Sequence, residues 1–181
     1  LLLFLPFVFI KNGMRTLAFL ILFTAISLSP TFAQDCKVEA DPFTGAKTVS
    51  FDFRNKSVFY SLVEGSAKLE IKFNYSGEFN TAINAGTEFM LKTEGDKIIK
   101  LKTSQPAFPV TSLMNAAIIS QYTYSISLTR EYLESIAGTT LVMMRHPDGK
   151  GGTTDIEFKG GFKKWGRSIV EGAQCLLANM K

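Results

Sequence analysis

The chain has 181 residues, with 20 Lys and Arg against 16 Asp and Glu, which gives a net charge of +4. Hydrophobic residues make up 46% of it and charged residues 20%. One His and two Cys are too few for a structural zinc site, which takes four such ligands.

Residues 14–33 have the pattern of a secretory signal peptide. Arg15 follows Met14, an apolar core runs from Leu17 to Leu28, and Ala33 ends a stretch with small residues at the two positions that a signal peptidase reads. These are the three parts of a signal peptide in their usual order, whereas a membrane anchor needs about 20 apolar residues. We expect cleavage after Ala33 and a secreted or periplasmic protein with no transmembrane anchor after cleavage.

Residues 1–13 precede the first methionine, and we interpret them as an upstream extension of the reading frame; a longer signal with an unusual leader is the alternative. Residues 34–181 are then expected to form a single globular α+β domain, long enough to bury a core. Removal of Lys11 and Arg15 lowers the net charge from +4 to +2. A nucleic-acid partner is therefore not expected.

The remaining segment has two cysteines, Cys36 near its start and Cys175 near its end. In an oxidising compartment such a pair is expected to form a disulfide bond. The bond would hold the N-terminal segment against the last helix. Two separate buried thiols are the alternative.

Apolar and polar residues alternate along much of the chain, with the period of two that is typical of half-buried strands. In the segment AKLEIKFNY, for example, Leu69, Ile71 and Phe73 alternate with charged and polar residues. Short turns separate such segments, so we predict a mainly antiparallel sheet of seven or eight strands. The expected strands cover residues 47–53, 57–63, 67–75, 87–93, 97–103, 121–128, 139–145 and 153–159.

Two helices are predicted late in the chain. Thr129 can cap a short helix over 130–137 that ends at Gly138, and this helix would pack Tyr132, Leu133 and Ile136 onto the sheet. A longer helix over 162–180 carries one apolar stripe. The stripe consists of Trp165, Ile169, Ala173 and Leu176. The predicted fold is α+β, with the C-terminal helix packed on one face of the sheet.

The residue types needed for catalysis or metal binding are sparse. His146 is the one histidine, and with Asp148 it falls in an apparent Pro-Asp-Gly turn that needs no catalytic explanation. Glu88, Glu94 and Asp96 are too widely spaced for a calcium loop. The segment GKGGTT, residues 149–154, lacks the phosphate-loop spacing and indicates a hairpin tip. No catalytic residue, metal or cofactor is predicted.

Two groups of basic residues are candidates for contact with an anionic partner. The first consists of Lys163, Lys164 and Arg167 beside Trp165, at the start of the last helix, and is the candidate anion or partner surface. The second consists of Lys97, Lys100 and Lys102 along a predicted strand. A solvated face is the alternative for both. Positive charge is unfavourable at the N-terminus of a helix, so stabilisation of the helix does not explain the first group.

The segment CKVEADPFTGAKTV contains a cysteine followed by an Asp-x-Phe-Thr-Gly turn, and it resembles the start of small uncharacterised secreted bacterial proteins. The matching residues are Cys36, Asp41, Phe43, Thr44 and Gly45, with a looser likeness at Leu128 and Thr129. The resemblance implies export and brings no activity or catalytic residue.

These observations predict a non-catalytic exported domain that binds an unknown small ligand or an envelope or extracellular protein. Its aromatic strands could line an apolar pocket between sheet and helix, or they could form solid core. A hydrolase, such as a carboxylate-based glycosidase whose two carboxylates meet only in the folded chain, is the alternative. An envelope component that binds through its sheet edges or its basic helix is a third interpretation.

Overall fold

The computed structural model describes residues 36–180. The expected extension, the expected signal peptide and Gln34 lie outside the described residues. Within residues 36–180, no helix has the length and apolar character needed to cross a membrane.

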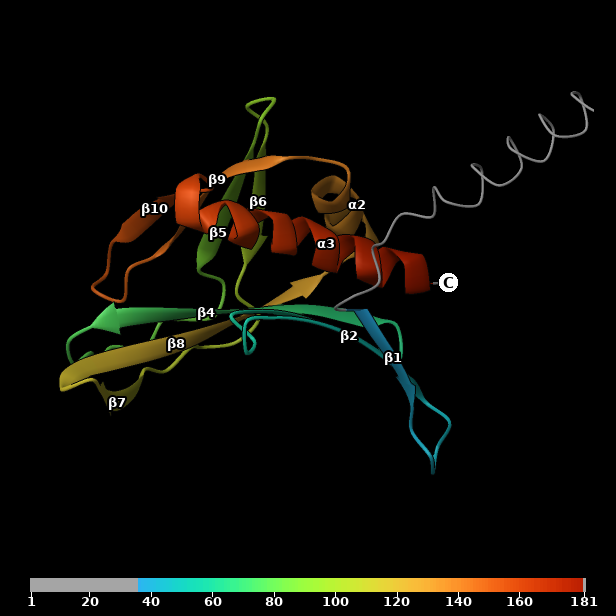
Figure 1. Cartoon of the computed structure of the whole chain (residues 1–181), viewed down its shortest axis with the longest axis horizontal. Coiled ribbons are helices and arrows are strands. Elements are labelled where there is room, and N and C mark those ends of the chain that lie inside the picture. Colours follow the sequence, from blue (N-terminus) through green and yellow to red (C-terminus); the bar gives the residue numbers. More distant parts are fainter. Residues whose placement is uncertain (1–35, 181) are drawn as a thin grey trace, which may run out of the picture. The chain divides into compact units, whose positions relative to one another are not determined.

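Six strands form one antiparallel sheet in the order β1-β2-β3-β4-β8-β7 (Figure 1). These strands are β1 (Cys36–Ala40), β2 (Lys47–Phe53), β3 (Val58–Val63), β4 (Ser66–Ser76), β7 (Val110–Met114) and β8 (Ala117–Leu128). The centre of the sheet is the long ladder between β4 and β8, which runs from Ala67 opposite Leu128 to Ser76 opposite Ile119.

Four further strands form a second antiparallel sheet in the order β10-β9-β5-β6. They are β5 (Glu88–Thr93), β6 (Ile98–Lys102), β9 (Leu141–Pro147) and β10 (Thr153–Glu157). The helices are α2 (Arg130–Ala137) and α3 (Lys163–Asn179), with the 3-10 turn η1 (Gly160–Phe162) directly before α3. The four-stranded sheet and both helices lie on the same side of the six-stranded sheet (Figure 1).

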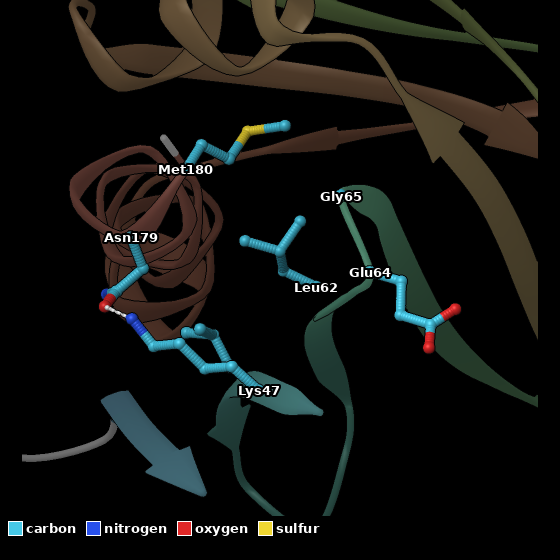
Figure 2. A pocket seen from close by; sticks show the side chains of 7 residues that line it. Lys47, Leu62, Glu64, Gly65, Asn179 and Met180 are labelled. Atoms are coloured by element: carbon cyan, nitrogen blue, oxygen red, sulfur yellow. Dashed lines mark hydrogen bonds between the residues drawn. The ribbon is translucent and has the colours of Figure 1, made fainter. Parts of the chain in front are cut away.

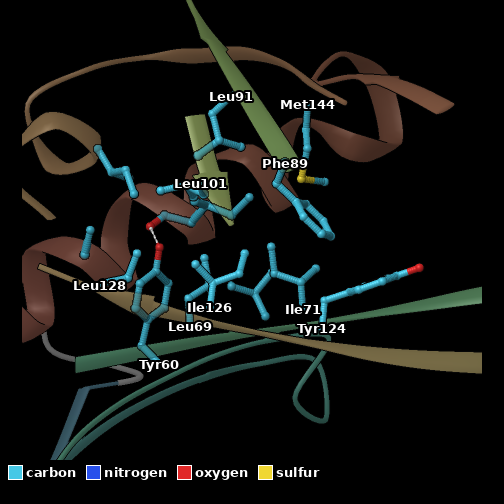
Figure 3. Packing of buried hydrophobic residues seen from close by; sticks show 14 of the residues in the cluster. Tyr60, Leu69, Ile71, Phe89, Leu91, Leu101, Tyr124, Ile126, Leu128 and Met144 are labelled. Carbon is cyan, nitrogen blue, oxygen red and sulfur yellow. Dashed lines mark hydrogen bonds between the residues drawn. The ribbon is translucent and has the colours of Figure 1, made fainter. Parts of the chain in front are cut away.

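The core fills the space between these two layers, as the alternation of the strands predicts. Ile71, Tyr124 and Ile126 point up from the six-stranded sheet, and Phe89 and Met144 point down from the four-stranded one (Figure 3). All five are buried. Burial of apolar surface at about 25 cal/mol per Å² is the main force that holds the two layers together.

Helix α3 covers the other half of the six-stranded sheet, over β2 and β3. Its residues Ile169, Ala173 and Leu176 are fully buried. The Tyr60 hydroxyl of β3 donates a hydrogen bond of 2.8 Å to the Ile169 carbonyl (Figure 3). The predicted apolar stripe of the C-terminal helix is therefore the surface that packs on the sheet.

Helix α2 begins and ends where the sequence predicts. The Thr129 side chain accepts a hydrogen bond from the Tyr132 amide, and Gly138 follows the last turn. Leu133 and Ile136 are fully buried against α3 and β6, but Tyr132 is 38% exposed, so its expected packing was wrong. A helix of two turns buries a narrow stripe, which here consists of Leu133 and Ile136.

The predicted α+β class is confirmed, but the strand count was too low and the strands form two sheets. The missing strands are β1 and β7, at the two edges of the six-stranded sheet. All five residues of β7 and four of the five in β1 are exposed. A strand that buries neither face needs no alternation, so its sequence carries no period of two.

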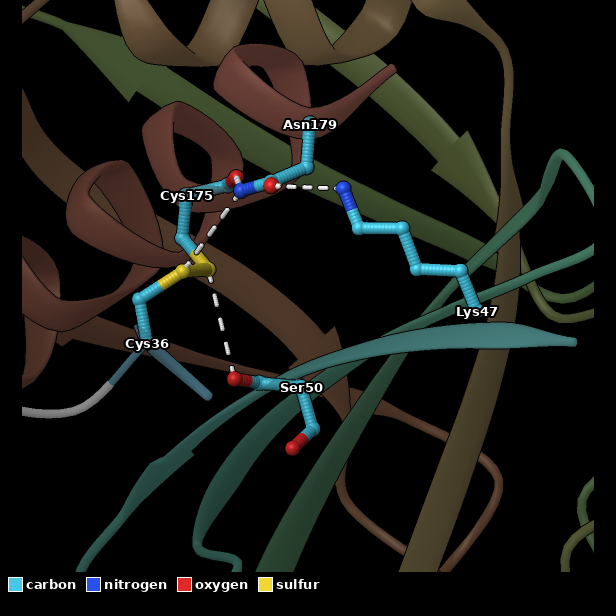
Figure 4. Close-up of a disulfide and its surroundings, with 5 residues drawn as sticks. All are labelled: Cys36, Lys47, Ser50, Cys175 and Asn179. Atoms are coloured by element: carbon cyan, nitrogen blue, oxygen red, sulfur yellow. Dashed lines mark hydrogen bonds between the residues drawn. A yellow bond between two sulfur atoms is a disulfide. The ribbon is translucent and has the colours of Figure 1, made fainter. Parts of the chain in front are cut away.

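The predicted disulfide bond between Cys36 and Cys175 is present (Figure 4). The two Cα atoms are 5.8 Å apart, although 139 positions separate the residues in the sequence. Near the bond, Asn179 accepts a hydrogen bond of 3.2 Å from the Lys47 ammonium group of β2. The disulfide bond therefore joins the edge strand β1 to the last turns of α3.

Candidate functional site

Two of the hollows in the described part of the chain lie at opposite ends of α3. The first, of about 420 Å³, lies between the C-terminal end of α3 and the β2–β3 region, with Leu62 facing Met180 across it (Figure 2). The second, of about 650 Å³, lies beside the N-terminal half of α3 and is called the basic groove here. Both volumes fall in the range of small-molecule sites.

The floor of the basic groove is apolar. It is made by Leu141 and Val142 at the start of β9, Phe158 after β10, and Val170 of α3. The Phe158 amide donates to the Val142 carbonyl at 2.8 Å, and the Glu94 amide donates to the Thr140 carbonyl at 2.9 Å. These backbone hydrogen bonds hold the β5–β6 turn and the end of β10 against the start of β9.

A glycine allows α3 to lie close to this floor. A Cβ atom on Gly166 would stand 2.6 Å from Cγ of Phe158, well inside contact distance. The Phe158 ring therefore packs directly on the backbone of the helix. The position of the groove wall depends on the absence of a side chain at residue 166.

The rim of the groove is basic on the side of α3, where Lys163, Lys164 and Arg167 line it. Arg167 forms an ion pair of 3.3 Å with Glu171. Within residues 36–180, neither Lys163 nor Lys164 takes part in an ion pair. The first turn of α3 holds no acidic residue and its N-cap makes no side-chain hydrogen bond. The positive end of the helix dipole adds to the two uncompensated charges.

The structure separates Trp165 from the three basic residues with which the sequence groups it. Trp165 is two positions after Lys163, which is roughly 200° around a helix. Its ring packs on Phe73 at a centroid distance of 5.1 Å and on Phe162 at 6.3 Å. Trp165 therefore supports the core on the other side of α3 and does not line the groove.

The second basic group lies along an edge of the four-stranded sheet. Lys100 and Lys102 are exposed on β6, Lys97 lies in the preceding turn, and Lys100 pairs with Glu88 at 3.4 Å. None of these three lysines lines either of the two hollows. This arrangement is that of a solvated sheet edge.

His146 lies within β9, so its expected place in the turn with Asp148 was wrong. The side chain is 2% exposed and stacks on Phe73 at a centroid distance of 3.9 Å. Its Nδ1 lies 2.8 Å from the Pro147 carbonyl oxygen, which also accepts a hydrogen bond of 2.7 Å from Tyr75. Because a carbonyl can only accept, Nδ1 is the donor in this hydrogen bond and carries a proton.

Burial is also the main cause of the titration behaviour in this cluster. It lowers the pKa of His146, against the opposing effects of the Pro147 carbonyl and of the charges on Asp148 and Asp155. It raises the pKa of Tyr124 to about 12 and that of Tyr75 further. Nε2 of His146 is buried with no hydrogen-bond partner among the described residues. The cluster is a neutral, buried part of the core.

The carboxylates considered for a calcium loop point to different partners. Asp96 pairs with Lys92 at 2.7 Å, Glu88 pairs with Lys100, and Glu94 lines the basic groove. Over residues 36–180, no three His, Cys, Asp or Glu side chains gather closely enough to hold a metal ion. The segment 149–154 forms the β9–β10 connection and the first residues of β10, as the hairpin interpretation predicts.

The groove floor was not predicted from the sequence. Leu141, Val142 and Phe158 were read as strand residues, and Val170 does not belong to the apolar stripe of α3. A half-buried valine gives no sequence signal that separates a groove wall from ordinary core. The basic group was visible in the sequence as three charges within five positions, but its place beside an apolar hollow was not predicted.

Comparison of the chain with protein-family models, with curated protein sequences and with solved structures finds no match. The function must therefore be argued from the geometry and charge of the site.

Proposed function

We propose that this protein is a non-catalytic exported domain whose basic groove binds a ligand with an apolar body and an anionic group, such as a carboxylate or a phosphate. The observation that supports this proposal is an apolar floor bounded on one side by Lys163, Lys164 and Arg167. The floor suits the apolar body, and the lysines, which have no acidic partner within the described residues, suit the anion.

The arrangement of charge favours a binder over the alternative of a hydrolase. A glycosidase holds two carboxyl groups on either side of the scissile bond. The groove lining includes one carboxylate, that of Glu94, together with three basic groups. Such a site attracts an anion and offers no acid and base pair for a substrate between them.

Export agrees with the disulfide bond, which persists in oxidising compartments. It also agrees with the signal-peptide pattern of residues 14–33 and with the likeness of residues 36–45 to secreted bacterial proteins. On this proposal the protein acts in the periplasm or outside the cell.

The direct test is calorimetric titration with alkyl compounds of equal chain length that end in a carboxylate, a phosphate, a hydroxyl or a trimethylammonium group. The two anionic compounds should bind, and the cationic one should bind least. Lengthening the alkyl chain should tighten binding by roughly 0.8 kcal/mol for each buried methylene group. Affinity that is independent of chain length would contradict an apolar floor.

Two triple variants separate the groove from general charge effects. Replacement of Lys163, Lys164 and Arg167 by Gln should weaken binding of the anionic compounds at least about tenfold, because it removes the charge-assisted hydrogen bonds. The matched control replaces Lys97, Lys100 and Lys102 by Gln, which removes the same charge from the edge strand β6. Equal loss in both variants would refute the groove as the site.

A third variant tests the floor alone. Val142→Trp fills the groove and leaves every charge in place, so it should abolish binding while the helix content stays unchanged. Native mass spectrometry of protein recovered from its own export compartment complements this test. An additional mass that is present on the wild-type chain and absent from Val142→Trp would identify the natural ligand.

A further inference from the structure

The outer strand β7 and its hairpin form an apolar, uncharged edge. Residues 103–129 contain no Asp, Glu, Lys or Arg. Within this segment Val110 is 66% exposed, Leu113 73% and Met114 54%. Within residues 36–180, β7 pairs with one strand only, β8.

The other three sheet edges are built differently. Proteins protect exposed edge strands with charged side chains, because an open row of amide and carbonyl groups can pair with another chain. Each of the other edge strands carries two such charges. They are Lys37 and Glu39 on β1, Lys100 and Lys102 on β6, and Asp155 and Glu157 on β10.

The backbone groups that point away from β8 can be identified. Asn115 and Ala116 form a two-residue turn with positive φ at both positions. Met114 and Ala117 flank this turn and are hydrogen-bonded to each other. Since hydrogen-bonded pairs alternate along an antiparallel ladder, Ser112 and Val110 also direct their backbone groups to β8. Thr111 and Leu113 therefore direct their amide and carbonyl groups outward. In agreement, Ile118, opposite Leu113, gives its carbonyl to Gly77 of the segment after β4.

We infer that β7 is a dimerisation edge, at which a second copy of this chain adds its own β7 antiparallel across a twofold axis at Ser112. This inference goes beyond the proposed function, since it concerns a different surface. Thr111 of one copy would oppose Leu113 of the second copy, and the reverse, which forms four backbone hydrogen bonds. The two six-stranded sheets would become one continuous sheet.

The side chains of β7 are compatible with this self-pairing. Val110 would oppose Met114 of the second copy on one face, and Ser112 would oppose its own copy. No like charges meet, because the strand has none. A twofold interface places the same patch on both subunits, and a strand face with Ser112 at its centre and Val110 and Met114 at its ends is suited to that symmetry.

A lipid surface is a poorer occupant of this edge. Hydrocarbon offers no hydrogen-bond partner, so the outward backbone groups of Thr111 and Leu113 would stay unpaired, which is strongly unfavourable. A second strand satisfies these groups. The occupant must therefore supply a backbone edge as well as apolar contact.

Cysteine crosslinking tests the predicted register. The native cysteines are joined to each other, so an introduced cysteine is the one free thiol among the described residues. At the twofold axis, Ser112 and its copy would form a non-hydrogen-bonded pair with Cα atoms about 4.5 Å apart, within the range for a disulfide. Val110 lies on the same face, but it would oppose Met114 of the second copy. The two Val110 residues would therefore be four positions apart along the strand, too far for a disulfide bond.

With glutathione disulfide as the oxidant, Ser112→Cys should form a covalent dimer at least about tenfold faster than Val110→Cys. Leu113→Pro removes an outward N–H and keeps the bonds to β8, so it should abolish the dimer seen by sedimentation velocity of the wild type. Circular dichroism of Leu113→Pro checks that the fold is intact.

Three results would overturn the inference. The first is a wild-type protein that stays monomeric up to about 1 mM, where even a dimer of very low affinity is populated. The second is equal crosslinking rates for Ser112→Cys and Val110→Cys. The third is flotation of monomeric protein with vesicles of mixed zwitterionic and anionic phospholipid, which would assign the hairpin to a membrane surface instead.

Discussion

Gly172 shows at the scale of one residue how α3 comes to lie on the six-stranded sheet. A Cβ atom at this position would lie 2.2 Å from Cδ2 of Tyr60 and 3.0 Å from Cδ1 of Phe51. Both rings are buried, so neither has room to move aside. The contact between ring and helix backbone also brings the Tyr60 hydroxyl within 2.8 Å of the Ile169 carbonyl.

Gly172→Ala is therefore expected to destabilise the protein by about 1–2 kcal/mol. Overpacking costs about 1–3 kcal/mol, and the better helix propensity of alanine returns up to about 1 kcal/mol. Urea unfolding with the disulfide intact measures the change. The control is Gly161→Ala, where a Cβ atom meets nothing within 4 Å. A destabilisation equal to that of the control would contradict the packing argument.

His146 is expected to make stability depend on pH below about 6.5, the ordinary pKa of a histidine side chain. Burial holds its pKa below the ordinary value near 6.5 of the unfolded chain, so the unfolded state binds a proton first as the pH falls. The contribution of His146 to the free energy of unfolding therefore has its full value above about pH 6.5 and decreases as the pH falls toward the lowered pKa of His146. Asp148 and Asp155, which favour the protonated form, limit the decrease.

His146→Gln tests this expectation, because glutamine keeps polar atoms at the site without a titrating group. The variant is expected to be less stable at pH 7.5 and to lose less stability than the wild type between pH 7.5 and 5.5. His146 is the one histidine of the chain, so no other imidazole contributes. Parallel curves for the two proteins would show that His146 does not govern this range.

At the scale of secondary structure, β1 depends on the disulfide bond more than any other strand does. It pairs with β2 alone, and four of its five residues are exposed. Its buried tie to the rest of the molecule is the bond from Cys36 to Cys175 in α3. The strand therefore has little apolar burial of its own to hold it in place.

The double variant Cys36→Ala and Cys175→Ala is expected to lose roughly 2–5 kcal/mol of stability, because the bond closes a long loop in the unfolded chain. Hydrogen exchange should accelerate first in β1, while the amides of the β5–β6 hairpin remain protected. Uniform acceleration across both sheets would show that the bond stabilises the whole fold and not this strand.

At the scale of the whole molecule, the disulfide bond and the proposed export belong together, since a cytosolic chain would keep both thiols reduced. We expect the protein recovered from its export compartment to begin at Gln34. Its denatured mass should be lower than that of the reduced chain by the mass of two hydrogen atoms. Intact-mass measurement before and after reduction decides both points. A chain that retains residues 14–33 would contradict export.

The two proposed surfaces lie on different parts of the molecule. The basic groove lies at α3 and the start of β9, whereas the β7 hairpin lies at the far edge of the six-stranded sheet. A dimer formed through β7 would leave both grooves open to ligand. The variants at Lys163, Lys164 and Arg167 are therefore expected to leave dimerisation unchanged, which sedimentation velocity can check.

The sequence by itself determined the fold class, eight of the strands, the start and end of α2, the presence of α3, the disulfide pair and the basic group at α3. Each of these follows from a pattern or a residue count that the sequence itself shows. Alternation marks a strand with one buried face, Thr129 and Gly138 satisfy or interrupt helix hydrogen bonds, and two cysteines alone can pair only with each other.

Tertiary structure alone decided how the strands divide into two sheets, that β1 and β7 form edges, and that His146 lies in the core. It also decided which apolar residues line the groove and which way Trp165 turns. These features depend on contacts between residues distant in sequence. The outcome for Val142 or Phe158 is set by where α3 comes to rest, and nothing within the local sequence specifies that position.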